Sequence, residues 1–291
     1  MIPLPLDIKL LLPGYRARWR ARYACMLAEL EALAPSLTYG EDDGTPWIEL
    51  AQENLRLFGF RTELKNAEVY RILRGALPPS IPLSHFRLVK DCLNRYVYPH
   101  MRPDLKPAEF ATEAMFGFHG QHKDAIADLA DADAREKLSQ AFVPRPDDVV
   151  IDCGPFLGFG ELRIAPALVD GHMFAVEADR ACHALLSRNM SHNGIENVTV
   201  LHRAVWDSET ELDLQSDFAQ ANSLVSEVHI GAEVERVRTI TIDAIVEAHS
   251  IQKLDMLSLT LNGAEVEAIK GAERTLTNLR PRIRLAGWYA R

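Results

Sequence analysis

The stretch from Asp148 to Gly158, DVVIDCGPFLG, decides the fold of this chain. Its apolar run ends in a carboxylate and then glycine, which is typical of a strand buried in a parallel sheet. Gly154 lets the backbone turn tightly and approach a ligand, and Gly158 permits close packing where a helix begins. The spacing is not GxGxxG, so the loop does not predict a diphosphate, and a tight turn without a ligand is an equal alternative.

Downstream of this loop, apolar runs alternate with amphipathic segments up to the end of the chain. The predicted strands cover 148–152, 172–176, 198–201, 253–261 and 282–286, and the predicted helices cover 181–190 and 264–276. Two further runs, 211–214 and 237–241, predict a β insertion. Strands separated by helices of this length form βαβ units, so we expect an α/β, Rossmann-like, doubly wound sheet.

An acidic residue stands at the end of the second predicted strand. Glu177 follows Asp152 by 25 residues. In dinucleotide-binding folds an acid at this place accepts hydrogen bonds from both ribose hydroxyls. A glycine turn that does not fit a diphosphate, combined with this acid, indicates an adenosine ligand with a methionyl tail.

The first 145 residues have apolar residues at helical spacing and show no strand alternation. The predicted helices cover 14–33, 47–57, 67–77, 84–98, 107–116 and 121–142, with prolines at several of the breaks. We therefore expect an all-helical accessory or lid domain over 1–145 and the α/β domain over 146–291.

Composition limits the partners. The chain of 291 residues has 32 basic and 41 acidic residues and a net charge of −9, which disfavours nucleic acid and fits a small-molecule substrate. The N-terminal apolar run is broken by Asp7, Lys9 and Pro13, so we expect no signal peptide, no membrane span and a cytoplasmic protein. The four cysteines form no CxxC pair, and His119 and His122 lack convergent carboxylates, so no metal site is expected. The sequence leaves the oligomeric state unknown.

From Val149 onward the sequence resembles the FkbM-type methyltransferases, which depend on S-adenosylmethionine (SAM). The resemblance lies in VVIDCGPFLG, FAVEADRACHALLSRNMSHNGIENVTVLHRAVWD, TITIDAI, and GAEVEAIKGAERTL followed by RPRI. It implies the class I methyltransferase fold with SAM as cofactor. Such a sheet normally adds an antiparallel strand, so we expect either a sheet that lacks this strand or a shortened chain.

The resemblance also implies which residues bind SAM. Asp152, Gly154 and Gly158 would surround the methionyl end, and Glu177 would hold the ribose. The Arg203–Ala204 segment would lie near the adenine. Phe156 and Ala178, within the same two loops, complete the expected cofactor-binding set.

One segment departs from the family. The strand before the last long helix usually reads Lys-x-Asp-x-Glu-Gly, and here it reads Ser258-Leu-Thr260-Leu-Asn262-Gly263. Ser258, Thr260 and Asn262 are the catalytic candidates, because this strand end faces the sulfonium in the fold. Hydroxyl and amide groups orient a substrate but take no proton near neutral pH. Either the base lies elsewhere, or the reaction needs none.

Three functions remain open on this sequence. The first is methyl transfer to an oxygen or nitrogen of a small metabolite, with SAM as cofactor. The second is intramolecular cyclisation of SAM, with SAM as substrate and methylthioadenosine as product, as in azetidine-2-carboxylate synthases. The third is a SAM-binding module without catalysis, which is disfavoured because the cofactor-facing residues are intact.

Overall fold

The computed structural model describes residues 37–51, 53–62, 79–92, 143–216 and 233–285, with Gly14, Arg74 and Leu224. The chain forms two compact units, Met1–Val97 and Tyr98–Arg291. Residues 93–142 lie outside the described part, so the domain boundary at 145 stays a prediction.

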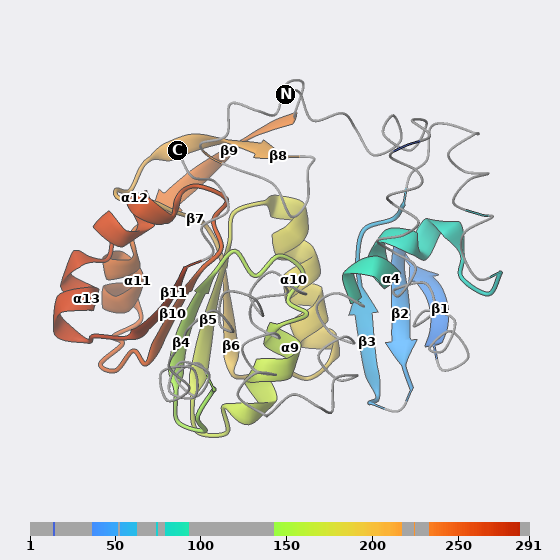
Figure 1. Cartoon of the computed structure of the whole chain (residues 1–291), viewed down its shortest axis with the longest axis horizontal. Coiled ribbons are helices and arrows are strands. Elements are labelled where there is room, and N and C mark those ends of the chain that lie inside the picture. The colour runs from blue at the N-terminus through green and yellow to red at the C-terminus, as the bar shows by residue number, and fades with distance from the viewer. Residues whose placement is uncertain are drawn as a thin grey trace. The chain divides into compact units, whose positions relative to one another are not determined.

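The second unit is built on a parallel sheet, which confirms the doubly wound α/β fold (Figure 1). Its strands, in the spatial order β11-β10-β4-β5-β6, are Arg282–Leu285, Met256–Leu259, Val149–Cys153, His172–Glu177 and Val198–His202. The chain runs outward from β4 to β6 and then returns to the other side of β4. The strand order therefore reverses between β4 and β10, and in such sheets ligands bind outside the carboxyl ends of the strands at this point.

Helices cover both faces of the sheet (Figure 1). On one face lie α11, α12 and α13, which are Ile242–Ala248, Glu265–Lys270 and Glu273–Asn278; on the other lie α9, η4 and α10, which are Glu161–Ile164, Ala165–Ala167 and Arg180–His192. Ile151 and Leu257 belong to the core of the first face, and Val150 and Met256 to that of the second. Alternate residues of the central strands thus reach opposite cores, which is why β4 and β10 are largely apolar.

The predicted helix over 264–276 is wrong as a single element, because α12 ends at Lys270 and α13 begins at Glu273. A Cβ at Gly271 would lie 2.3 Å from the backbone oxygen of Trp206, so the chain passes another segment closely there. The β insertion is confirmed. It comprises β7 (Ala204–Val205), β8 (Glu211–Ser216) and β9 (Glu233–Ile240), in the order β7-β9-β8.

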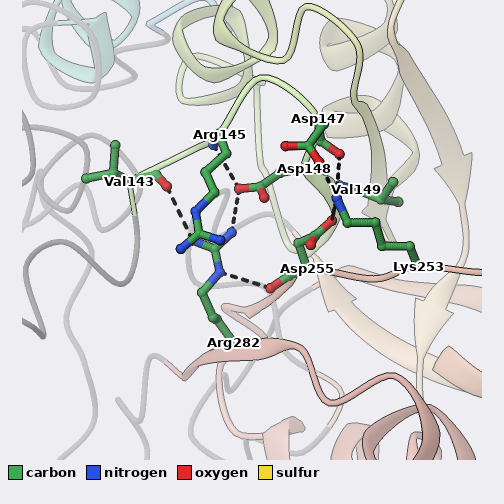
Figure 2. A network of polar contacts seen from close by, with 8 residues as sticks. All are labelled: Val143, Arg145, Asp147, Asp148, Val149, Lys253, Asp255 and Arg282. Atoms are coloured by element: carbon green, nitrogen blue, oxygen red, sulfur yellow. Dashed lines mark hydrogen bonds and ion pairs between the residues drawn. The ribbon is translucent and has the colours of Figure 1, made fainter.

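A network of hydrogen bonds and ion pairs joins the amino ends of β4, β10 and β11 (Figure 2). Asp148 is fully buried, and its Oδ2 accepts hydrogen bonds from the Arg282 guanidinium and from the backbone N–H of Arg145 (2.9 Å). Arg282 also donates to the carbonyl oxygens of Asp255 (3.1 Å) and Val143 (3.3 Å). One arginine thus joins the edge strand to the segment that leads into β4.

The expectation of an all-helical N-terminal region is wrong. The first unit contains an antiparallel sheet of β1 (Leu37–Asp42), β2 (Thr45–Leu50) and β3 (Leu55–Phe58). The predicted helix over 47–57 therefore falls on two strands and their turn. Asp43 and Gly44 join β1 to β2 with φ of 53° and 75°. An Asp-Gly pair with both φ positive is a strong signal for a two-residue hairpin, and it outweighed the helical spacing of the apolar residues.

The predicted helix over 84–98 is confirmed for α4, Phe86–Cys92. Ser84 does not cap it, since a 3₁₀ turn, η2 (Leu83–His85), precedes it with Pro82 at its N-cap. The other predicted N-terminal helices, and His119 and His122, lie outside the described residues, apart from Gly14 and Arg74. Among the described residues, none of the helices is long and apolar enough to cross a membrane.

Candidate functional site

The loops that follow β4, β5 and β10 are bonded to one another at the point where the strand order reverses. The N–H of Gly154 donates to the carbonyl oxygen of Val176, and that of Thr260 donates to Cys153, both at 2.9 Å. These bonds fix three strand ends against each other, so the side chains that leave them are held in one place.

Gly154 is required by the close approach of the β10 loop. Its φ is +86°, and a Cβ there would lie 2.1 Å from the backbone oxygen of Thr260. At Gly158 a Cβ would instead meet the side chains of Leu186 (2.4 Å) and Met190 (2.8 Å) on α10. The first glycine thus permits two loops to touch, and the second permits a loop to pack on a helix.

Gly154→Ala should therefore destabilise the protein by about 2 kcal/mol or more, because the left-handed backbone and the clash with a carbonyl oxygen add. Gly194→Ala is the matched control: its φ is +67°, but a Cβ there meets nothing within 4 Å. It should cost about 1 kcal/mol. Denaturant unfolding of both variants tests this, and equal losses would contradict the account of Gly154.

Glu177 ties the ends of β4 and β5 together. It is 8% exposed, and its Oε2 accepts the backbone N–H of Phe156 while its Oε1 accepts that of Asp179, each at 3.0 Å. Phe156 has a φ of 61°, so the bond holds a conformation that a phenylalanine rarely adopts. A carboxylate has about four acceptor positions, so Glu177 retains acceptor capacity for a ligand.

Burial raises the pKa of Glu177 from 4.5 to about 7, although the backbone hydrogen bonds from Asp179 and Phe156 oppose the shift. Between these two pH values the unfolded chain releases the Glu177 proton while the folded chain retains it. The free energy of unfolding should therefore fall as pH rises from 4.5 to about 7, by an amount on the order of 3 kcal/mol. Denaturation at a series of pH values measures this, and Glu177→Gln should remove that part of the decline. If the free energy of unfolding of the unaltered chain and of Glu177→Gln changed with pH in the same way, this account would be wrong.

Asp152 supplies a second buried carboxylate at the same place. It is 6% exposed and lies in register with Ser258 on β10 and Ala175 on β5. None of the residues that the structure describes donates a hydrogen bond to it. The Asp152 oxygens are not among the fully buried oxygens that lack a hydrogen-bond partner, so they are accessible, and a cationic or hydrogen-bonding group can reach them.

The three catalytic candidates lie at different depths. Ser258 is fully buried, and its hydroxyl accepts from Nη1 of Arg284 at 2.9 Å. Thr260 is partly exposed and contacts the glycine loop through its backbone. Asn262 is partly exposed in a turn, with a φ of 52°. Thr260 and Asn262 are therefore accessible to solvent, whereas Ser258 lies beneath the surface.

Glu265 holds the turn that carries Asn262. Its Oε1 accepts the N–H of Leu261 and its Oε2 that of Gly263, both at 2.9 Å. Glu265 lies in the GAEVEAIKGAERTL block, but the sequence analysis gave it no role. These two hydrogen bonds give Glu265 a role in holding the turn.

The residues expected near adenine surround the end of β6. Nε2 of His202 lies 3.1 Å from the carbonyl oxygen of Ala178, and the His202 ring lies 4.8 Å from that of His183. Arg203 is exposed and donates to the carbonyl oxygen of His202, whereas Ala204 is buried and begins β7. Sequence reasoning missed both histidines, because His202 reaches Ala178 only through the pairing of β5 with β6, and His183 on α10 contacts His202 only in the folded chain.

The described residues hold no group of three or more His, Cys, Asp or Glu side chains that fits a metal ion. Cys92, Cys153 and Cys182 are buried free thiols. The polar chemistry of the described site is thus that of Asp152, Glu177 and their neighbours.

Residues 163–287 match the family model of the methyltransferase FkbM domain. The resemblance drawn from the sequence is confirmed over these residues, and with it SAM as cofactor. The match includes Glu177, Thr260 and Asn262 and begins after the glycine loop. The residue roles within the site stay predictions.

Among solved structures, the chain is similar to a SAM dependent methyltransferase from Aquifex aeolicus, at 14% identity over 54% of this chain and 65% of that chain, with a TM-score of 0.28. It is also similar to TYW2 of M. jannaschii, solved in complex with AdoMet, at 17% identity over 29% of this chain and 46% of that chain, with a TM-score of 0.20. The chain thus spans less than two thirds of the length of either protein. No curated protein matches the chain.

Proposed function

We propose that this chain, whose residues 163–287 form a methyltransferase FkbM domain, transfers a methyl group from SAM to an oxygen or nitrogen of a small metabolite. The observation that carries the proposal is the pair of buried carboxylates at the reversal of strand order. Asp152 has no donor among the described residues, and Glu177 has acceptor capacity left.

The two carboxylates fit the two polar ends of SAM. Asp152 would accept hydrogen bonds from the methionyl ammonium, and Glu177 from the ribose hydroxyls. Charge-assisted bonds of this kind are about twice as strong as neutral ones. When bound, SAM supplies a sulfonium whose methyl carbon is electrophilic. Phe156 donates its backbone N–H to Glu177, and Ala178 follows Glu177 in the chain. Both residues would contact the nucleoside.

The residues that face the acceptor are neutral. Thr260 and Asn262 would orient it by hydrogen bonds, which contribute to rate by positioning. Both Glu265 oxygens are already bonded to backbone N–H groups, so that acid holds the turn. An acceptor that is nucleophilic without first losing a proton, such as a neutral amine, suits these groups best.

A second candidate is favoured by the same neutral positions. Cyclisation of SAM joins its own amino nitrogen to its γ-carbon, with release of methylthioadenosine and a proton. It requires no separate acceptor and no protein carboxylate at 258, 260 or 262.

Incubation of the purified chain with SAM, with and without a metabolite extract, tests the proposal. Mass spectrometry of the nucleosides should show S-adenosylhomocysteine only when extract is present. If SAM alone gave methylthioadenosine above a protein-free control, the proposal of methyl transfer would be wrong and cyclisation of SAM would take its place. SAM binding in calorimetry without either product would instead favour a binding module.

A further inference from the structure

The β8–β9 pair of the insertion packs one of its faces on the loop that follows β5. Leu214 of β8 and Glu235 of β9 are in register, so their side chains leave the same face, the inner face of the pair. Leu214 is buried in a cluster with Val237, and Ala178 packs against this cluster. Ala178 directly follows Glu177 in the chain. The inner face therefore contacts the residue next to the proposed ribose acceptor.

Glu235 extends from this inner face to the first turn of α10. Its Oε2 accepts the backbone N–H of Arg180 at 3.2 Å, and its Oε1 accepts Nε of the same residue at 3.0 Å. The Glu235 side chain is only 19% exposed, whereas that of Arg180 is 78% exposed. An ion pair with so exposed a guanidinium contributes little. The hydrogen bond to the backbone N–H is therefore the contact that holds the chain in place.

Three carboxylates accept the N–H groups at the start of α10. The first N–H groups of a helix have no partner within the helix, and its positive end favours acids. Glu177 accepts the N–H of Asp179 at 3.0 Å, and Asp179 accepts that of Cys182 at 2.8 Å. Glu235 accepts the N–H of Arg180, which lies between these two, from 55 residues away. Of these three acceptors, only Glu235 joins the loop to another element.

We propose that Glu235 is a positioning residue for the nucleoside end of SAM. By accepting the N–H of Arg180, it fixes the segment 177–180 against the inner face of the β8–β9 pair. The Glu177 carboxylate and Ala178 then keep the places at which they would meet the nucleoside. This inference rests on the proposed function, in which Glu177 accepts from the ribose hydroxyls. Glu235 acts through the segment and needs no contact with the ligand.

Two ligands that share the nucleoside test this role. Methylthioadenosine and S-adenosylhomocysteine both carry adenosine, and only the second carries the amino-acid part. Titration calorimetry of the full chain gives both affinities. Glu235→Leu should weaken both ligands by the same factor of about 5, since one hydrogen bond contributes about that much. Asp213→Asn is the control on the opposite face of the pair, where Asp213 and Arg236 are 60% and 62% exposed. It should change neither affinity.

Position 180 tests the backbone hydrogen bond directly. Arg180→Pro removes the N–H, and proline is favoured at the first helical position, which Arg180 occupies. Asp179 before it has φ −73° and ψ 127°, a conformation that a residue before proline adopts. Both ligands should again bind about 5-fold more weakly. Arg180→Ala keeps the N–H and should bind both ligands more tightly than Arg180→Pro does.

The double variant Glu235→Leu/Arg180→Pro should bind no more weakly than either single variant, because both changes remove the same hydrogen bond. Arg180→Pro also keeps the inference testable if Glu235→Leu does not fold. Unchanged affinities in Glu235→Leu and Arg180→Pro would overturn the inference, even if their free energy of unfolding fell, because the role would then be one in stability alone. Loss of S-adenosylhomocysteine affinity alone would overturn it too, since the effect would lie at the amino-acid end. Failure of the unaltered chain to bind either nucleoside would count against the proposed function itself.

Discussion

Arg282→Met is expected to lower the free energy of unfolding by about 3–5 kcal/mol, because it leaves a buried carboxylate without its cation. Asp148 is fully buried, and Arg282 donates to it from the edge strand (Figure 2). The backbone N–H of Arg145 alone would then remain to compensate the charge. Urea denaturation followed by circular dichroism, extrapolated to water, measures the loss.

Lys253→Met is the control for this prediction. Lys253 belongs to the same network and pairs with Asp147 at 2.7 Å and with Asp255 at 3.2 Å, but its own side chain is 50% exposed. Exposed pairs contribute little, so its variant should unfold close to the unaltered chain. If Arg282→Met had the same free energy of unfolding as the unaltered chain, another group would compensate the Asp148 charge and the prediction would be wrong.

Glu177→Ala is expected to weaken SAM binding by about 100-fold. It removes the proposed acceptor of two ribose hydrogen bonds, each worth about 1.5–3 kcal/mol to a charged group. It also leaves the N–H groups of Phe156 and Asp179 without the carboxylate that holds them. Titration calorimetry with SAM measures the change in affinity.

Glu247→Gln serves as the matched control, because that side chain is 74% exposed and its ion pair joins α11 to Arg274 on α13. Its SAM affinity should equal that of the unaltered chain. Unchanged affinity in Glu177→Ala itself would remove the ribose assignment. Binding by the unaltered chain should strengthen as pH rises through about 7, since only the ionised Glu177 accepts from both hydroxyls.

The α/β half was predictable because its strands carry an unambiguous pattern. Val149–Cys153 and His172–Glu177 are apolar except for Asp152, His172 and Glu177, as expected of strands covered on both faces.

The N-terminal sheet was not predicted. In β2 the buried residues Pro46, Ile48 and Leu50 alternate with less buried ones, but the large apolar Trp47 stands at one of the less buried positions and hides the alternation in the sequence. The Asp43–Gly44 pair was the available signal for a hairpin in this stretch, and the sequence analysis did not use it.

Within the candidate site, local sequence singled out Glu177 and Asp152, because Glu177 ends β5 and Asp152 precedes the last residue of β4. Their roles stay predictions. The contact between Arg284 and Ser258 could not be predicted from local sequence. The two residues are 26 positions apart in sequence, and only the register of β10 with β11 places the two side chains together. Contacts that depend on register between separate βαβ units leave no trace in a single segment of sequence.

The position of β4 at the centre of the sheet has a consequence for synthesis of the chain. Its first neighbour, β5, follows within a few tens of residues, but the bond between Val149 and Asp255 spans 106 residues. At ribosomal rates of about 5–20 residues per second, one edge of β4 stays unpaired for roughly 5–20 s after it is made. An open edge of this kind can pair with other chains, so this nascent protein would benefit from a chaperone until β10 emerges.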